Sequence, residues 1–409
     1  MEKRQAISRV IQDQFDQQVD FLQRLVRAKS TNPFTPEIAS AELPVEKDVA
    51  AAIHRELHTL GFKADLVGVS KERPNVVCHI PGTRETAKNL ILTTHMDTIE
   101  ANDQYTRDPW GAQIENGQLY GVGVADAKAQ IASFIYAAYA LYKLGINLAG
   151  HLTLAFVVDE ETGACSPYGT QYLLNQGILD GDAAIIGEPG NNILAIGHRG
   201  LYRFRIRIMG EATHTGLRAW EQGRQGRNAI LDMVRLAQAL SEHPLPQTDS
   251  AAFPGRKSVL TFPTLIRGGD GINIVPDSCE AYGDVRLLPG LSADTVKQII
   301  KEHLASLFIQ NYQLEDLITV PAAETNPQAD IVRCLAKSIQ AVTGTYPQLE
   351  GSGPACDGWM FITRGIPTVC GYGVTCGGVH GADEWIDLES LRRVTEIYAC
   401  TILSYLSER

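Results

Sequence analysis

The sequence has 409 residues, of which 44% are hydrophobic and 20% charged, a composition that excludes a disordered chain and a length that suggests two folded domains. Acidic residues outnumber basic ones by 47 to 36, and the basic residues are scattered, so we expect neither nucleic acid nor an anionic membrane as a partner. The sequence has no apolar run of about 18 residues, which is what a transmembrane helix requires.

The first half of the chain has the pattern of an α/β domain. Residues 1–20 are polar with apolar side chains at helical spacing, unlike a secretory signal, and we therefore expect a cytoplasmic protein. Four short apolar runs follow, over residues 75–80, 90–94, 152–158 and 183–187. A helical segment over residues 128–144 connects the second run to the third. This alternation predicts βαβ units and a mostly parallel sheet.

The pattern changes after residue 188. Residues 202–209 alternate between apolar and basic side chains, as a half-exposed antiparallel strand does. We predict further elements in the order helix, strand, strand, helix and strand, at residues 227–240, 258–266, 280–286, 292–307 and near Ile318. This is the order of a ferredoxin-like α+β domain. From residue 331 the chain returns to helix, a strand over residues 367–371, and a final helix.

We therefore expect a discontinuous α/β domain with an α+β domain inserted into it. The first domain would comprise residues 1–192 and 322–409, and the inserted domain residues 193–321.

Side chains of the metal-binding type fall at the carboxyl ends of the predicted parallel strands, where open α/β sheets bind ligands. Each of three strands is followed by such residues, the loop before the helix over residues 128–144 adds another, and the glycine-rich stretch 371–381 adds a last one. The residues are His95, Asp97, Glu160, Glu161, Glu188, Asp126 and His380. Imidazole and carboxylate together are typical ligands of zinc and related ions.

Five segments resemble a known family. They are residues 94–97 (THMD), 119–128 (LYGVGVADAK), 159–163 (DEETG), 187–189 (GEP) and 379–384 (VHGADE). In this order they resemble the di-zinc aminoacylase and carboxypeptidase family, which includes acetylornithine deacetylase, succinyl-diaminopimelate desuccinylase and the glutamate carboxypeptidases. The resemblance implies a zinc-peptidase-like catalytic domain and an inserted lid or dimerisation domain.

The resemblance also implies a ligand set for two Zn²⁺ ions, with Co²⁺ or Mn²⁺ as possible substitutes. His95 and Glu188 would complete one site, Glu161 and His380 the other, and Asp126 would bridge both. Glu160 would be the general base that takes a proton from the attacking water. Asp97 would be a carboxylate outside the ligand set that fixes the tautomer of the His95 imidazole.

Four residues of the inserted domain match further positions of the family. The resemblance implies that His214 stabilises the tetrahedral oxyanion and that Asn273, Arg286 and Arg199 bind the substrate. Arginine suits a substrate carboxylate because its planar fork can bind both oxygens. The resemblance further implies a homodimer formed through the inserted domain.

We expect a metal-dependent deacylase of a small N-acyl amino acid, with a dipeptidase or carboxypeptidase of the same family as the alternative. A serine or cysteine hydrolase is a second class, but the sequence has no GxSxG motif. A binding protein without activity is a third class, and the presence of Glu160 argues against it. The eight cysteines include no CxxC pair, so we expect reduced, mostly buried thiols rather than a redox or ligand role.

Overall fold

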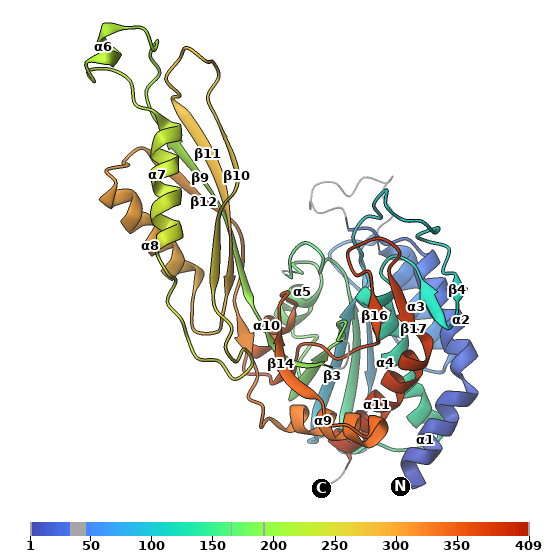
Figure 1. Ribbon diagram of the computed structural model, residues 1–409. Helices are drawn as coiled ribbons and strands as arrows, with labels where there is room; N and C mark the ends of the chain where they lie inside the picture. The colour runs from blue at the N-terminus through green and yellow to red at the C-terminus, as the bar shows by residue number, and fades with distance from the viewer. Residues whose placement is uncertain (1, 33–45, 165, 191–192, 408–409) are drawn as a thin grey trace. The chain divides into compact units, whose positions relative to one another are not determined.

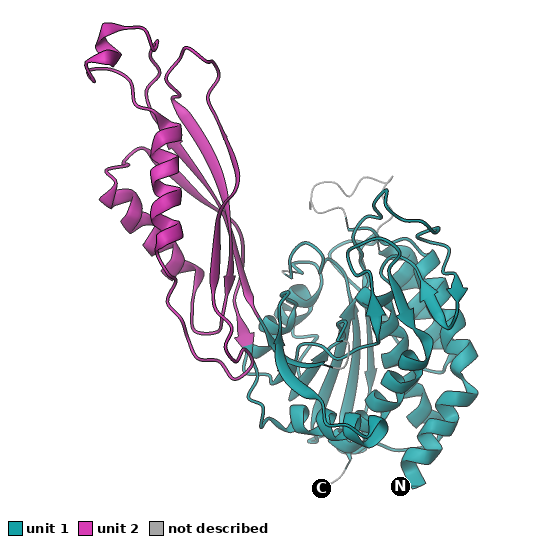
Figure 2. Cartoon of the chain, viewed as in Figure 1, with its two compact units in different colours: residues 1–198, 324–409 teal, residues 199–323 magenta. Residues whose placement is uncertain are grey.

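The computed structural model describes residues 2–32, 46–164, 166–190 and 193–407, and it forms two compact units (Figure 2). Unit 1 comprises residues 1–198 and 324–409, and unit 2 comprises residues 199–323. The sequence placed these boundaries at residues 192/193 and 321/322. The first boundary lies later because strand β8 (Ile193–His198) pairs in parallel with β14 (Gln348–Ser352) and so belongs to unit 1.

A six-stranded sheet forms the centre of unit 1, in the order β1-β2-β6-β3-β7-β15 (Figure 1). The strands are β1 (Asp65–Val67), β2 (Asn75–Ile80), β3 (Asn89–His95), β6 (His151–Val157), β7 (Ala183–Ile186) and β15 (Thr368–Val369). The pairs β6/β3, β3/β7 and β7/β15 are parallel, as predicted. Strand β2 is antiparallel to β6, because residues 81–88 are too short for the crossover that would keep β2 and β3 in one direction.

The helix predicted before β6 is α4 (Ala129–Lys143), and nearly all of its side chains are buried. A helix that is apolar all round has to be covered on every side. Helices α1 (Glu2–Asp13), α2 (Phe15–Arg27) and α11 (Leu388–Leu406) pack against it. The single helix expected over residues 1–20 is thus two helices that meet at Gln14. Among the described residues, none of the helices combines the length and the hydropathy that crossing a membrane requires.

Two small sheets of unit 1 were not predicted. One has the order β13-β8-β14 and the other the order β16-β17-β5-β4. Most of these strands have only two or three residues, too few for a period-2 pattern to be visible in the sequence. Their bounds are β4 (Ile114–Glu115), β5 (Gln118–Tyr120), β13 (Ala323–Glu324), β16 (Cys376–Gly377) and β17 (Trp385–Asp387). The remaining helices of unit 1 are α3 (Lys47–Thr59), α5 (Thr170–Asn175), α9 (Asp330–Thr343) and α10 (Gly358–Ile362).

Unit 2 is a four-stranded antiparallel sheet in the order β10-β11-β9-β12, with two helices packed on it. Its main elements, in chain order, are β9 (Gly200–Met209), α7 (Ala229–Glu242), β10 (Val259–Gly268), β11 (Ser278–Leu287), α8 (Ala293–Ser306) and β12 (Tyr312–Val320). The predicted β-α-β-β-α-β order is confirmed. A short helix, α6 (Arg218–Glu221), is an addition that the sequence did not predict.

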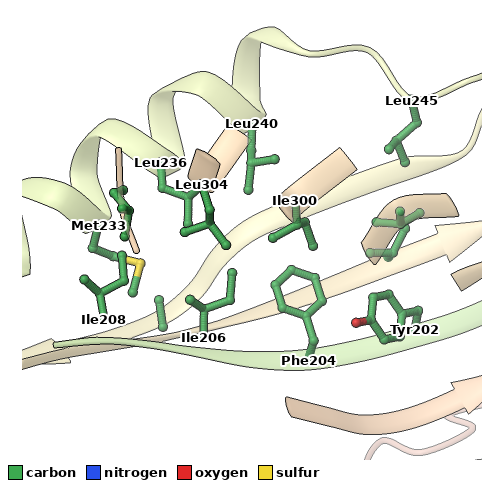
Figure 3. Close-up of a cluster of buried hydrophobic side chains, with 14 of the residues drawn as sticks. Tyr202, Phe204, Ile206, Ile208, Met233, Leu236, Leu240, Leu245, Ile300 and Leu304 are labelled. Carbon is green, nitrogen blue, oxygen red and sulfur yellow. The ribbon is translucent and has the colours of Figure 1, made fainter. Parts of the chain in front are cut away.

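The core of unit 2 lies between the sheet and the two helices (Figure 3). Tyr202, Phe204, Ile206 and Ile208 alternate along β9 and are all fully buried. Because side chains alternate across a strand, the arginines between them lie on the other face. Helix α7 contributes Met233, Leu236 and Leu240, and helix α8 contributes Ile300 and Leu304.

We predict that Phe204→Ala destabilises unit 2 by about 3–5 kcal/mol, because it leaves a cavity in this core. Phe204 stands directly opposite Gly283, whose missing side chain leaves space for the ring: a Cβ there would lie 2.3 Å from it. Thermal unfolding followed by circular dichroism tests this. Arg207→Ala, on the exposed face of the same strand, is the matched control and should change stability by no more than about 0.5 kcal/mol. Equal effects of the two substitutions would contradict the assigned face.

Candidate active site

His95 is the last residue of β3 and is buried. Its Nδ1 lies 2.9 Å from the main-chain oxygen of Asp97. Since a carbonyl can only accept, Nδ1 carries a proton in this contact, which leaves Nε2 as the nitrogen that a metal ion would bind. The Asp97 carboxylate, to which the sequence assigned this task, lies 3.6 Å from the same nitrogen. The main-chain oxygen and the carboxylate of Asp97 thus both lie on the Nδ1 side of the ring.

The Asp97 carboxylate also connects the ends of β3 and β6. Its oxygens accept hydrogen bonds from the main-chain N–H groups of Glu160 (3.2 Å) and Glu161 (2.9 Å) and from the side chain of Asn32 (2.7 Å). Burial opposes ionisation of Asp97, but His95 and these donors outweigh burial and lower its pKa. An ionised Asp97 thus fixes the turn that carries both glutamates.

Asp126 lies between two histidines. It belongs to the short turn η1 (Val124–Lys128), which begins the α4 region. Its Oδ1 is 3.0 Å from His95 Nε2, and its Oδ2 is 3.2 Å from His380 Nε2. On the His95 side, Glu188 Oε1 lies 4.0 Å from Nε2, and on the other side Glu161 Oε2 lies 3.3 Å from His380 Nε2. Each oxygen of one carboxylate therefore faces a different imidazole.

Two groups of potential metal ligands share Asp126. His95, Asp126 and Glu188 form one group, Asp126, Glu161 and His380 form the other, and within each group the ligand atoms lie within 4.8 Å of one another. Glu188 Oε1 is buried and accepts no hydrogen bond among the described residues, which is the condition of a ligand atom without its ion. The donor set and this orphaned oxygen fit two divalent metal ions.

The electrostatics of the site point the same way. Burial raises the pKa values of Glu160 and Glu188 well above the ordinary range, and the negative charges of neighbouring carboxylates raise them further. Hydrogen bonds to Asp126 and Glu161 raise the pKa of His380 to about 10. So many carboxylates in one buried place call for added positive charge.

Glu160 is buried beside these groups and belongs to neither of them. Its position depends on a buried ion-pair cluster that the sequence did not reveal. Arg73 contacts Asp159, directly before Glu160, at 3.2 Å and Glu46 at 2.5 Å, and all three side chains are almost inaccessible to solvent. The turn that carries Glu160 is thus held by Asp97 on one side and by Arg73 on the other.

The sequence pattern of the peptidase family M20/M25/M40 matches residues 91–404, which include the histidines and carboxylates of both groups. The chain belongs to this family. It is accordingly a metal-dependent hydrolase that acts on amide bonds, and both the predicted family and the predicted fold class are confirmed.

Curated M20 relatives cover most of the chain. A succinyl-diaminopimelate desuccinylase of Methylorubrum extorquens is 30% identical over 85% of this chain and 93% of the relative. An N-formyl-4-amino-5-aminomethyl-2-methylpyrimidine deformylase of Halalkalibacterium halodurans is 26% identical over 88% of each chain. Both names denote the removal of an acyl group.

Solved M20 structures share the fold at low sequence identity. The aminopeptidase PepT of Bacillus cereus superposes with a TM-score of 0.76 at 20% identity, covering 96% of this chain and 99% of that one. The YXEP protein of Bacillus subtilis, described as a dinuclear metal binding peptidase, has a TM-score of 0.70 at 15% identity, covering 97% and 99%. These similarities establish the M20 fold and give no information about the substrate.

Glu384 holds the loop that presents Asp126. Its two side-chain oxygens accept hydrogen bonds from the main-chain N–H groups of Gly123 (2.8 Å), Ala125 (2.8 Å) and Asp126 (3.1 Å). Glu384 is 2% exposed and lies four residues after His380. One segment thus carries His380 and orients Asp126. The M20 motif marks Glu384 in the sequence, but only the structure shows this role.

We predict that Glu384→Gln weakens metal binding by about 10–100-fold, the usual effect of losing a residue that orients a ligand. The amide nitrogen cannot accept a hydrogen bond and would leave at least one N–H of this loop without a partner. A competition titration against a chelator measures the affinity. Glu389→Gln, which changes an exposed residue near the start of α11, is the control. Unchanged metal affinity in Glu384→Gln would contradict this role.

The residues assigned to the inserted domain all lie in unit 2. The side chains of His214 and Asn273, both exposed, lie 3.3 Å apart. Arg286 forms an ion pair with Asp284 at 2.9 Å, and Arg199 donates to the main-chain oxygen of Lys257. Sequence motifs thus identified neighbours in space here as well.

A third arginine joins Arg199 and Arg286. Arg286 of β11 pairs with Leu201 of β9 and Val259 of β10, so the chain segments around Arg199 and Arg256 meet at this end of the sheet. Burial and the charges of Arg256 and Arg286 lower the pKa of Arg199. The sequence did not single out Arg256, because an isolated arginine in a loop carries no signal without the sheet register.

Proposed function

We propose that this M20 enzyme removes the acyl group from a small N-acyl amino acid by hydrolysing its amide bond. Two Zn²⁺ ions would bind at the two ligand groups, with Co²⁺ or Mn²⁺ as possible substitutes. The observation that carries the proposal is the Asp126 carboxylate shared between His95 and His380, with buried Glu160 beside both groups and part of neither. This arrangement suits hydrolysis by a bound water molecule, in which Glu160 acts as the base. A protein that only stored metal ions would not need a buried carboxylate that is not a ligand.

The chemistry divides between the ions and the side chains. Bound metal ions would lower the pKa of a water molecule and polarise the scissile carbonyl group. Glu160 takes the proton from that water and later delivers it to the leaving amine. Burial raises the pKa of Glu160, and a carboxylate that is a stronger base accepts a proton more readily. Asp97 and Arg73 keep Glu160 in place, through its main-chain N–H and through Asp159.

The arginines of unit 2 favour a substrate with a free carboxylate. Arg199, Arg256 and Arg286 bring three positive charges to one end of the sheet, where Arg286 forms an ion pair with Asp284. An amino acid product has such a carboxylate, and so does a dicarboxylic acyl group such as succinyl. The two relatives named for desuccinylation and deformylation support removal of an acyl group over cleavage of a peptide.

A substrate panel tests the proposed function. N-acetyl, N-formyl and N-succinyl amino acids are compared with dipeptides and tripeptides, with zinc present and after chelation. We expect the highest kcat/KM for an N-acyl amino acid and loss of turnover after chelation. Preference for dipeptides or for C-terminal cleavage would favour the alternative, a peptidase of the same family. Turnover that survives complete chelation would contradict the metal mechanism.

We predict that Arg286→Ala raises KM about 10–100-fold for a carboxylate substrate, with a smaller change in kcat, because a charge-assisted hydrogen bond contributes about 1.5–3 kcal/mol. Steady-state kinetics measure the split between KM and kcat. Arg207→Ala, which removes an exposed arginine from the same sheet, is the control. An unchanged KM in the Arg286→Ala enzyme would show that Arg286 does not bind the substrate carboxylate.

We also propose that the enzyme is a homodimer formed through unit 2, with His214 acting on the oxyanion from the lid. Strand β10 lies at the edge of the sheet, and Leu265 and Ile266 on it are 42% and 43% exposed. An apolar edge strand is a surface that pairs readily with a second copy. Analytical ultracentrifugation tests the dimer. A monomer with full activity would overturn both parts of this proposal.

A further inference from the structure

Unit 1 contains a second cluster of metal-binding side chains that the hydrolytic mechanism does not use. Potential ligand atoms of His198, Cys356 and Cys370 lie within 4.8 Å of one another, and all three residues are buried. His198 ends β8, Cys370 directly follows β15, and Cys356 lies in the loop between β14 and α10. Three separate segments thus bring a nitrogen and two sulfur atoms together.

We propose that His198, Cys356 and Cys370 form a structural site for a thiophilic metal ion, with zinc as the expected occupant. Soft thiolate ligands select Zn²⁺ or Cu⁺, whereas the carboxylate-rich groups around Asp126 suit harder ions as well. Two sulfurs bound to one zinc ion lie roughly 3.8 Å apart, given Zn–S distances of about 2.3 Å. The potential ligand atoms of the cluster lie within 4.8 Å of one another.

The backbone around the cluster contacts the sulfur of Cys356 in two ways. The Gly358 N–H donates to Cys356 Sγ at 3.4 Å, and such a donor also suits a thiolate. The Cys356 thiol donates to the main-chain oxygen of Cys370 at 3.7 Å, a contact that would be lost when the thiol releases its proton to bind the ion. Gly358 also leaves room for the second sulfur, because a Cβ at this position would lie only 2.6 Å from Cys370 Sγ and 3.3 Å from Cys356 Sγ. Any other residue at position 358 would therefore displace the sulfurs.

His198 presents a lone pair to the same loop. The Trp359 N–H donates to His198 Nε2 at 3.1 Å, so Nε2 is the unprotonated nitrogen, as a metal ligand must be. The metal ion would replace this N–H as the partner of Nε2. Trp359 is in the first turn of α10, where the N–H group makes no hydrogen bond within the helix. Both thiols would release their protons to solvent when the ion binds.

The site would stabilise the loop beside the hydrolytic centre. Asp357, next to Cys356, accepts hydrogen bonds from Ser166 (2.7 Å) and from Thr170 at the start of α5 (2.5 Å). A metal ion between Cys356, Cys370 and His198 would tie this loop to β8 and β15. Of the eight cysteines, the seven that the structure describes form no disulfide with one another, and Cys165 lies outside the described residues. The site was not predicted from the sequence, because its cysteines form no CxxC pair.

Cobalt loading tests this proposal independently of the hydrolytic centre. The full chain, kept reduced, is stripped with a chelator and reloaded with Co²⁺, and its near-ultraviolet absorption is recorded. We expect a thiolate-to-cobalt charge-transfer band, which carboxylate and imidazole ligands do not give. The variant Cys356→Ser/Cys370→Ser should lose the band and bind one metal ion fewer per chain. Cys334→Ser, at a partly exposed cysteine of α9, is the control. It should keep the absorption band and the full number of bound metal ions.

X-ray absorption at the zinc edge of the unmodified, zinc-loaded protein avoids any folding defect of a variant. A zinc–sulfur distance near 2.3 Å would support the site. Absence of both the cobalt band and sulfur scattering would overturn it, whether or not the enzyme hydrolyses amides. A Cys356–Cys370 disulfide in protein isolated under reducing conditions would overturn it too.

Discussion

Replacing Glu160 by Gln should lower kcat by about 10²–10⁴-fold, the contribution typical of a general acid or base, while metal content stays the same. The amide keeps the size of the side chain but cannot take a proton from water. Glu160 belongs to neither ligand group, so its removal should leave both ions bound. Steady-state kinetics combined with elemental analysis of the same preparation measure the two quantities.

Glu161→Gln is the matched control for this prediction, because the adjacent Glu161 faces His380 at 3.3 Å. It should lose metal together with activity. If Glu160→Gln lost metal as well, Glu160 would be a ligand and the proposed division of labour between the two glutamates would be wrong. If Glu160→Gln kept full activity, another group would be the base.

Asp126→Asn should have the second large effect, and it should act through the metals. Only a carboxylate can place one anionic oxygen toward His95 and the other toward His380. We expect metal affinity to fall by more than the 10–100-fold that the loss of an orienting residue causes, and activity to fall at least as far as in Glu160→Gln. Because a ligand that binds only the native state stabilises it, zinc should raise the melting temperature of the native enzyme more than that of the variant.

Isothermal titration with zinc and thermal unfolding at several zinc concentrations measure these effects. Asp383→Asn is the control, since Asp383 lies near His380 in the sequence but bonds to Thr106 and Arg107 instead. An Asp126→Asn enzyme that bound both ions with native affinity would contradict the bridging role.

The sequence predicted the position of the site because regular strands end at regular places. His95 ends β3 and Glu188 lies just after β7, and because these strands are parallel the two residues meet at one edge of the sheet. Motifs in these loops carry enough signal to identify the family from one sequence. The inserted domain was predictable for a similar reason, since the alternation of Phe204 and Ile206 with arginines reveals a sheet with one buried face.

Residues that act through tertiary contacts could not be found in this way. Arg73 supports the site from a distant segment, and nothing in its local sequence distinguishes it from a solvent-exposed charge. Glu384 stands in a family motif, but its hydrogen bonds to the loop of Asp126 could not be read from that motif. Asp97 shows a subtler limit: its position was predicted, but the contacts that its main-chain and side-chain oxygens make with His95 depend on atomic geometry. The cluster of His198, Cys356 and Cys370 depends on the pairing of β8 with β14, which was not predicted.

The most direct test of the central claim is the hydrolytic activity of enzyme stripped of metal, measured before and after zinc is added back. Elemental analysis first establishes that the stripped protein contains no zinc. We predict that it does not hydrolyse an N-acyl amino acid and that added zinc restores the activity. Full activity in the stripped protein would show that the shared carboxylate of Asp126 does not mark a hydrolytic metal centre.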